Sequence, residues 1–128
     1  MEEKKDITTR EDVILMVNSF YELVQKDPEL DHMFNQVAQL DWNAHLPKMY
    51  DFWETIIFKN ALYSGNPMRV HKQLHGLQHL TPGMFDTWLA LFNKNMDNLF
   101  EGKNAFEAKT RALSIATMIQ MKTVYGKH

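Results

Sequence analysis

Hydrophobic side chains recur along the chain at the spacing of an α-helix, and no segment alternates between apolar and polar residues with a period of two. The first helical stripe covers residues 13–24, behind Thr8 and Glu11, which have the spacing of a capping box. Asp27 and Pro28 then end this helix and predict the start of a short one, because aspartate caps helices and proline is tolerated at their first position.

A second long helix is predicted to begin between Asp41 and Asn43. Pro47 is expected near its first turn, because a proline deeper in a helix removes a backbone hydrogen bond. The apolar stripe of this helix consists of Trp42, His45, Met49, Phe52, Trp53 and Ile56. A histidine within such a stripe must find a polar partner or face a polar cavity, so His45 is a candidate functional residue.

Three further helices are predicted in the second half of the chain, each from a cap residue at its start. The caps are Asn66, Thr81 and Asn104, and Gly76 and Gly102 are expected to end the first two helices. The first of the three is short, roughly residues 67–74, and the second has about five turns. The chain is therefore predicted to be all-α.

The length of 128 residues suits one domain with one core. We expect a single domain over residues 1–128, with about residues 1–8 as an N-terminal extension. The net charge of −2 and the absence of a basic run give no reason to expect a nucleic acid or an anionic membrane as partner. The chain has no cysteine, no signal peptide and no apolar run near the ~20 residues of a membrane span, so we expect it in the cytoplasm.

The candidate chemistry lies in histidines with apolar neighbours, since no phosphate-binding glycine loop, catalytic triad or carboxylate pair appears. His71 lies next to Val70 on the predicted short helix, and a neutral imidazole in such surroundings can hold haem iron at one axial position. Tyr21 and Trp88 each place a hydrogen-bond donor on a core-facing side chain. Taken singly, each of these residues is better explained without a functional role. His71 would then be a partly exposed histidine near a loop, and His45, Tyr21 and Trp88 would be ordinary core residues.

A different site would also use His71. The three residues His71, His75 and His79 recur every four positions, which on a continuous helix would align their imidazoles for zinc or copper. Gly76 interrupts that helix, and no carboxylate stands at a neighbouring turn to complete the ligand set. A dedicated metal site is therefore the weaker alternative.

Taken together, these residues resemble the truncated, two-on-two globin family, and specifically its third group, over about residues 13–125. The resemblance rests on Phe20 and Tyr21, Phe34, residues 45–53 (HLPKMYDFW), residues 63–67 (YSGNP), His71 and residues 85–92 (FDTWLALF). The order and spacing of these segments are specific. The loop glycine motifs of the first two groups are missing here, as they are in the third.

The resemblance implies a globin-like, all-α fold, a two-on-two helical sandwich around haem b, with His71 as the proximal iron ligand. It also implies that Tyr21, His45 and Trp88 form the distal side, where they stabilise a bound ligand. The other residues expected to contact the haem are Phe34, Lys48, Met49, Phe52, Trp53, Arg69 and Leu74. Among them Phe34 would wedge against the porphyrin, and Lys48 and Arg69 could reach a propionate.

The resulting hypothesis is a globin that reversibly binds oxygen, or nitric oxide or carbon monoxide, at a pentacoordinate haem iron. One alternative is a haem enzyme that oxidises nitric oxide or reduces peroxide, with an unidentified reductase as partner. A carboxylate near the proximal ligand would favour O–O cleavage, but no position within one turn of His71 carries one, which disfavours a dedicated peroxidase. Another alternative is a haem-free helical interaction module whose histidines are incidental.

Overall fold

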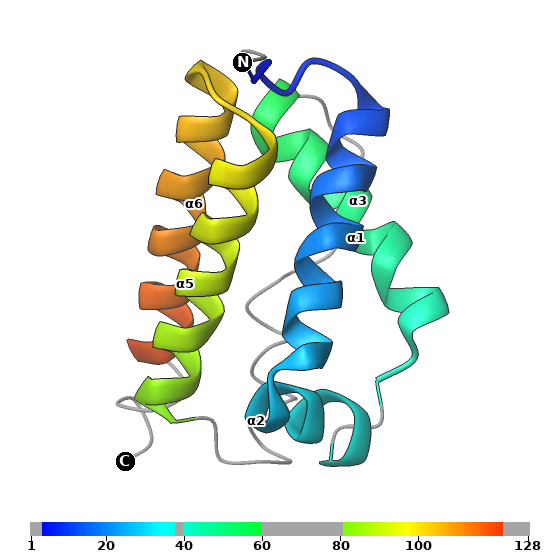
Figure 1. Ribbon diagram of the computed structural model, residues 1–128, viewed down its shortest axis with the longest axis vertical. Helices are drawn as coiled ribbons and strands as arrows, with labels where there is room; N and C mark the ends of the chain where they lie inside the picture. The colour runs from blue at the N-terminus through cyan, green and yellow to red at the C-terminus, as the bar shows by residue number, and fades with distance from the viewer. Residues whose placement is uncertain (1–3, 38–39, 60–80, 122–128) are drawn as a thin grey trace.

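The computed structural model describes residues 4–37, 40–59 and 81–121, and every regular element among them is helical (Figure 1). In chain order these are α1 (Arg10–Lys26), α2 (Pro28–Asp31), a π-helix (His32–Val37), α3 (Trp42–Phe58), α5 (Pro82–Leu99) and α6 (Lys103–Gln120). The predicted all-α class is confirmed. The predicted short helix at residues 67–74 lies outside the described residues, as do His71, His75 and His79.

The four long helices form two pairs around one core. α1 packs against both α3 and α5, and α6 packs against both α5 and α3. Figure 1 shows α5 and α6 side by side in opposite directions, with α1 and α3 forming the other half of the molecule. Each helix turns one apolar stripe inward, as the helical periodicity predicts. No helix in the described part of the chain is long and apolar enough to cross a membrane.

The first capping box lies one residue later than predicted. Thr9, not Thr8, caps α1, and the reciprocal partner is Asp12, not Glu11. Asp12 occupies the partner position of the capping box because its nearly buried carboxylate also accepts the Thr8 N–H at 2.9 Å and pairs with Lys5 at 2.9 Å. The pattern of residue types fits both registers, so only these additional contacts select one of them.

Pro47 lies deeper in α3 than predicted. Asp41 caps this helix through the amides of Asn43 and Ala44, so Pro47 is the sixth helical residue and lies beyond the first turn. The expectation was wrong because it counted the lost backbone hydrogen bond and did not consider that water could satisfy the unpaired carbonyl one turn earlier. That carbonyl belongs to Asn43, and both Asn43 and Pro47 are exposed, so water can replace the missing hydrogen bond.

Gly102 was predicted to end α5, but it lies at the start of α6. α5 ends at Leu99, and Gly102 occupies the N-cap of α6 with a φ of +145°. Asn104, the predicted cap, is instead the second residue of α6. The capping carboxylate comes from Asp6, nearly a hundred residues away, and accepts the Asn104 and Ala105 amides at 2.9 Å each. A Cβ on Gly102 would lie 2.5 Å from Cγ of Asp6, so the close approach requires glycine.

The core unites residues from all these helices and from the segment before α1. Ile7 is fully buried, so the residues just ahead of α1 are part of the packed structure. The largest side chains that are almost completely buried are Phe92, Ile7, Met16, Leu30, Met33 and Met96. On α6, alanines at positions 105, 108, 112 and 116 face inward and allow the helix to approach α5 closely.

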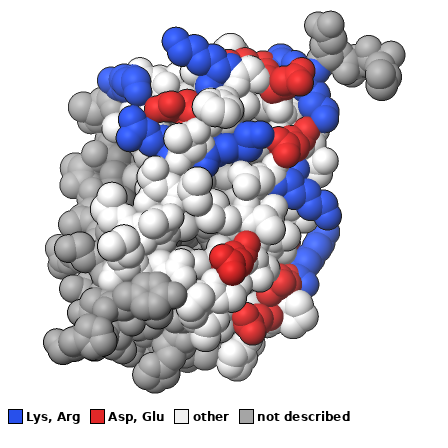
Figure 2. Space-filling model, turned by 90° about the vertical axis from the view of Figure 1, so that its left-hand side faces the viewer, with Lys and Arg blue, Asp and Glu red and all other residues white. Residues whose placement is uncertain are grey.

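Charged residues on the surface are mixed in sign. Figure 2 shows a face on which basic and acidic side chains lie close together beside a neutral area. Elsewhere in the described part of the chain, opposite charges also pair, as in Lys109–Asp97 and Arg111–Glu107. The described surface on this face therefore carries no large field of a single sign.

Candidate functional site

Two polar side chains meet inside the apolar core. Tyr21 lies on the inward face of α1 and His45 on that of α3, and they are 6% and 7% exposed. His45 Nε2 and the Tyr21 hydroxyl are 3.2 Å apart, a hydrogen bond whose direction depends on the imidazole tautomer. The rings stand almost perpendicular, 81° apart, with centroids separated by 5.4 Å. Burial raises the pKa of the Tyr21 hydroxyl, so it stays protonated near neutral pH.

Aromatic rings extend from this pair across the centre of the molecule. Phe20 contacts Tyr21 at a centroid distance of 5.0 Å and meets Trp88 of α5 edge to face at 5.3 Å. Trp88 stacks on Phe92 at 5.7 Å, and Phe92 stacks on Trp53 of α3 at 5.1 Å. The structure therefore joins Tyr21 to two other predicted site residues, Trp88 and Trp53, through ring contacts.

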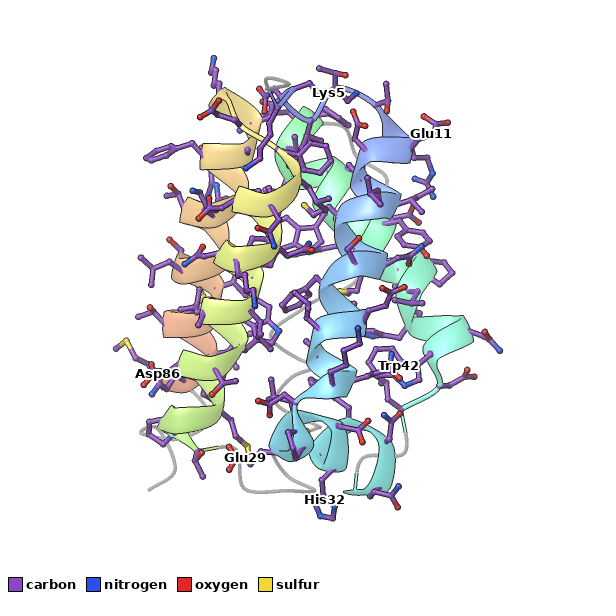
Figure 3. All side chains as sticks on the ribbon, viewed as in Figure 1. Lys5, Glu11, Glu29, His32, Trp42 and Asp86 are labelled. Atoms are coloured by element: carbon purple, nitrogen blue, oxygen red, sulfur yellow. The ribbon has the colours of Figure 1, made fainter. Side chains whose placement is uncertain are left out.

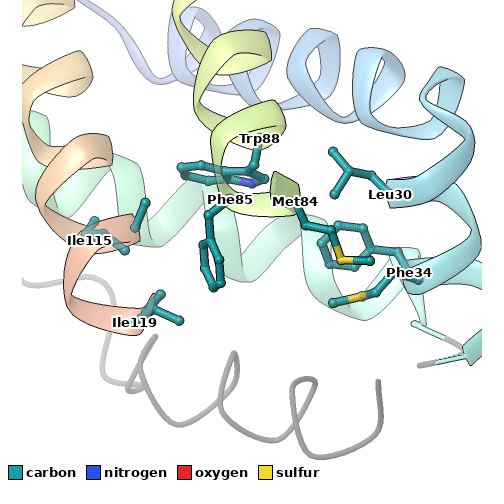
Figure 4. Close-up of a pocket in the computed structure, with 9 residues that line it drawn as sticks. Leu30, Phe34, Met84, Phe85, Trp88, Ile115 and Ile119 are labelled. Atoms are coloured by element: carbon teal, nitrogen blue, oxygen red, sulfur yellow. The ribbon is translucent and has the colours of Figure 1, made fainter. Parts of the chain in front are cut away.

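An apolar pocket opens beside this aromatic cluster. Its lining residues are Leu30, Met33, Phe34, Met84, Phe85, Trp88, Ile115, Ala116 and Ile119. Figure 4 shows labelled side chains from α5, from α6 and from the segment around α2 converging on one space. Phe34 and Trp88 are the predicted site residues among them. No lining residue in the described part of the chain is charged.

Most residues of the pocket wall were not among the predicted site residues. Phe85, Ile115, Ala116 and Ile119 stand in the apolar stripes of their helices, which marks them only as inward-facing. Nothing in a stripe shows whether it meets another stripe or borders a cavity. The abundance of aromatic and methionine side chains names no particular residue, and only Phe85 of this set lay within a segment that carried the family resemblance, residues 85–92.

The other predicted residues fall into three sets. Met49, Phe52 and Trp53 are buried on α3 but are not part of the described pocket wall. Lys48 is exposed on the same helix. Arg69, His71 and Leu74 lie outside the described residues, so the proximal ligand and one propionate partner remain predictions.

The described residues fit a flat, largely apolar group such as a porphyrin. The wall contains the planar rings of Phe34, Phe85 and Trp88, which suit packing against such a face. The indole N–H of Trp88 has no acceptor among the described residues, and Tyr21 and His45 add further donors nearby. An apolar wall with a few donors at one side is the chemistry that a haem with a polar ligand requires.

Comparison with known proteins identifies the class. A family model of bacterial-like globins matches residues 5–122, nearly the whole chain, so the protein belongs to the bacterial-like globin family. Globins hold haem, and family membership therefore implies a haem cofactor here. The expected globin-like fold is confirmed.

The similarity is more specific than the class. A group 3 truncated haemoglobin of Campylobacter jejuni is 27% identical over 129 residues, covering 98% of this chain and 99% of that protein. The crystal structure of the group III truncated haemoglobin from Campylobacter jejuni matches with a TM-score of 0.82 and covers 98% of this chain and all of its own. The relation to group III truncated globins is thereby confirmed.

Proposed function

We propose that this protein is a cytoplasmic globin that binds haem b through His71 and reversibly takes up a diatomic ligand, with oxygen as the reference. The observation that carries the proposal is the buried hydrogen bond between Tyr21 and His45, beside an apolar pocket walled by Phe34 and Trp88. The Tyr21 hydroxyl can donate one hydrogen bond and accept another, so beside its bond to His45 it can also bond to a polar ligand that enters the pocket.

When bound, haem supplies an iron with one open coordination position, and ligands there carry partial negative charge. Tyr21 stays protonated because burial raises its pKa, so it can donate to such a ligand. If His45 donates through Nε2 to the Tyr21 oxygen, the hydroxyl hydrogen of Tyr21 is left for the ligand. Two hydrogen bonds in series polarise one another, which makes the Tyr21 hydroxyl a stronger donor.

Trp88 supplies a second donor from α5, since its indole N–H has no other acceptor among the described residues. The apolar residues exclude water and so strengthen these hydrogen bonds. In this proposal Phe34, Met49, Phe52, Trp53 and Leu74 pack around the porphyrin, and Lys48 and Arg69 pair with its propionates.

The absorption spectrum of the purified protein tests the proposal directly. We expect a red protein with a Soret band, and His71→Ala should lose haem or change its ferrous spectrum, because the iron loses its protein ligand. His32→Ala is the matched control, since this imidazole is exposed at one end of the molecule (Figure 3). Protein that stays colourless after addition of hemin, or a His71→Ala spectrum equal to wild type, would contradict the proposal.

A further inference from the structure

The indole ring of Trp42 packs against both Tyr21 and His45, the hydrogen-bonded pair in the core. It is the first residue of α3 and is half-buried beside α1 (Figure 3). Its ring centroid lies 5.2 Å from that of Tyr21 and 6.0 Å from that of His45, with interplanar angles of 63° and 80°. Trp42 thus contacts both members of the pair edge-on, and any shift of its indole changes the space available to them.

The indole is fixed by a chain of hydrogen bonds that reaches α2. Its Nε1–H donates to Oδ1 of Asn35 at 2.5 Å. The amide nitrogen of Asn35 in turn donates to a carboxylate oxygen of Asp31 at 2.5 Å. Both ends of the Asn35 amide are therefore occupied, which fixes its orientation and leaves its oxygen turned toward Trp42.

Asn35, the acceptor for Trp42, lies within the π-helix. In a π-helix one turn holds more residues than in an α-helix, and such turns are frequent at functional sites. Here the same short element sends Phe34 to the pocket wall and Asn35 to Trp42. The amide of Leu40 donates to the carbonyl of Phe34 at 2.9 Å, which ties the segment before α3 to the π-helix.

We propose that Trp42, anchored by Asn35 and Asp31, is a positioning residue that keeps Tyr21 and His45 in hydrogen-bonding geometry and so slows escape of the bound ligand. Trp42 acts through the pair, because its own N–H is already used by Asn35. This inference rests on the proposed function. It assigns Trp42 a role beyond its place in the apolar stripe, and it adds Asn35 and Asp31, which neither the stripes nor the family resemblance indicated.

Oxygen dissociation from the haem-loaded protein, measured by stopped flow, tests this role. Trp42→Phe removes the N–H and part of the ring, and Asn35→Leu removes its acceptor. We expect each to speed dissociation about two- to fivefold, which corresponds to about 0.4–1 kcal/mol, a fraction of one hydrogen bond. The C–O stretching frequency of the ferrous carbon monoxide complex should rise in both, since a weaker distal donor leaves the bond less polarised.

A double variant separates anchoring from general loss of packing. Asp31→Asn combined with Asn35→Asp exchanges the two groups but keeps both hydrogen bonds, because the new amide donates to the new carboxylate and that carboxylate accepts from Trp42. We expect dissociation within twofold of wild type. Gln36→Ala, at an exposed neighbouring position on the π-helix, serves as the neutral control.

The outcomes distinguish this inference from the proposed function. If Tyr21→Phe speeds dissociation while Trp42→Phe and Asn35→Leu leave both the rate and the C–O frequency unchanged, only the positioning role is wrong. It is also wrong if the double variant is as fast as Asn35→Leu. If the wild type takes up no haem, or Tyr21→Phe releases oxygen at the wild-type rate, the proposed function and the positioning role both fail.

Discussion

Replacing Tyr21 with phenylalanine removes one hydroxyl from the centre of the molecule and leaves the ring contacts with Phe20 and Trp42 in place. The variant loses the 3.2 Å hydrogen bond to His45 and, in the proposed function, the donor to the ligand. A net hydrogen bond is worth about 1 kcal/mol, and about 1.4 kcal/mol equals a tenfold change in rate. We therefore expect oxygen dissociation to be about five- to tenfold faster.

Stopped-flow measurement of oxygen dissociation gives this rate, and thermal unfolding gives the accompanying loss of stability. The lost hydrogen bond should lower the free energy of unfolding by about 0.5–1.5 kcal/mol, or a few degrees in Tm. Tyr50→Phe is the matched control, because it also removes a phenol hydroxyl, one that donates to Asn18 between α3 and α1 at 2.5 Å. Tyr50 belongs to neither the pair nor the pocket wall.

Comparing Tyr21→Phe with Tyr50→Phe tests whether the Tyr21 hydroxyl donates to the ligand. Both should be slightly less stable, but only Tyr21→Phe should release oxygen faster. Equal dissociation rates in the two variants would refute the reasoning that the Tyr21 hydroxyl faces the ligand. Faster dissociation in both would indicate that the rate follows global stability and not a local donor.

Three residues at the starts of long helices, Gly102 of α6, Gly83 of α5 and Asp12 of α1, give predictions about stability. Gly102→Ala should lower the free energy of unfolding by about 2 kcal/mol or more, because its φ of +145° is strained for alanine and the new Cβ meets Asp6. Gly83→Ala, with its nearest neighbour at 3.8 Å, should instead raise stability by about 0.5–1 kcal/mol in the same urea titration. Burial would raise the pKa of Asp12, but hydrogen bonds from Thr8, Lys5 and Thr9 outweigh it and lower the pKa to about 2. Asp12 therefore contributes stability that is present above its ordinary pKa of 3.8 and is lost as pH falls toward 2. Asp12→Asn should cost about 2 kcal/mol at pH 7 and flatten this acid dependence, whereas the exposed Glu11→Gln should change neither.

Local signals in the sequence located the helices well. Asp27 and Thr81 cap the helices that they were expected to start, and Asp41 caps the helix whose start was predicted between Asp41 and Asn43. A cap acts on amides two or three residues away, so these starts can be predicted from local sequence. The same local reasoning misplaced the first capping box by one residue and assigned Gly102 to the wrong helix. In both cases contacts outside the cap pattern decided the outcome. Thr8 and Lys5 hold Asp12 from just ahead of α1, and Asp6 reaches the start of α6 from nearly a hundred residues away.

In the candidate site, too, individual residues could be predicted from local sequence, but contacts between distant residues could not. His45 and Tyr21 could be selected from the sequence, because a polar group within an apolar stripe is costly unless it is satisfied. Their mutual hydrogen bond could not, since it joins residues 24 positions apart on two helices. Trp42 stood in the predicted stripe as an ordinary core residue. Its hydrogen bond to Asn35 joins α3 to the π-helix, an element that no local pattern predicted.

The sequence alone determined that the chain is helical, where most helices start and which side chains turn inward, because these properties depend on neighbours within a turn or two. The tertiary structure alone decided which inward faces meet, which of them leave the pocket beside Phe34 and Trp88, and how Tyr21, His45 and Trp42 come together. Those arrangements depend on contacts between distant segments, and a distance in space is not encoded in the spacing of residues along one helix.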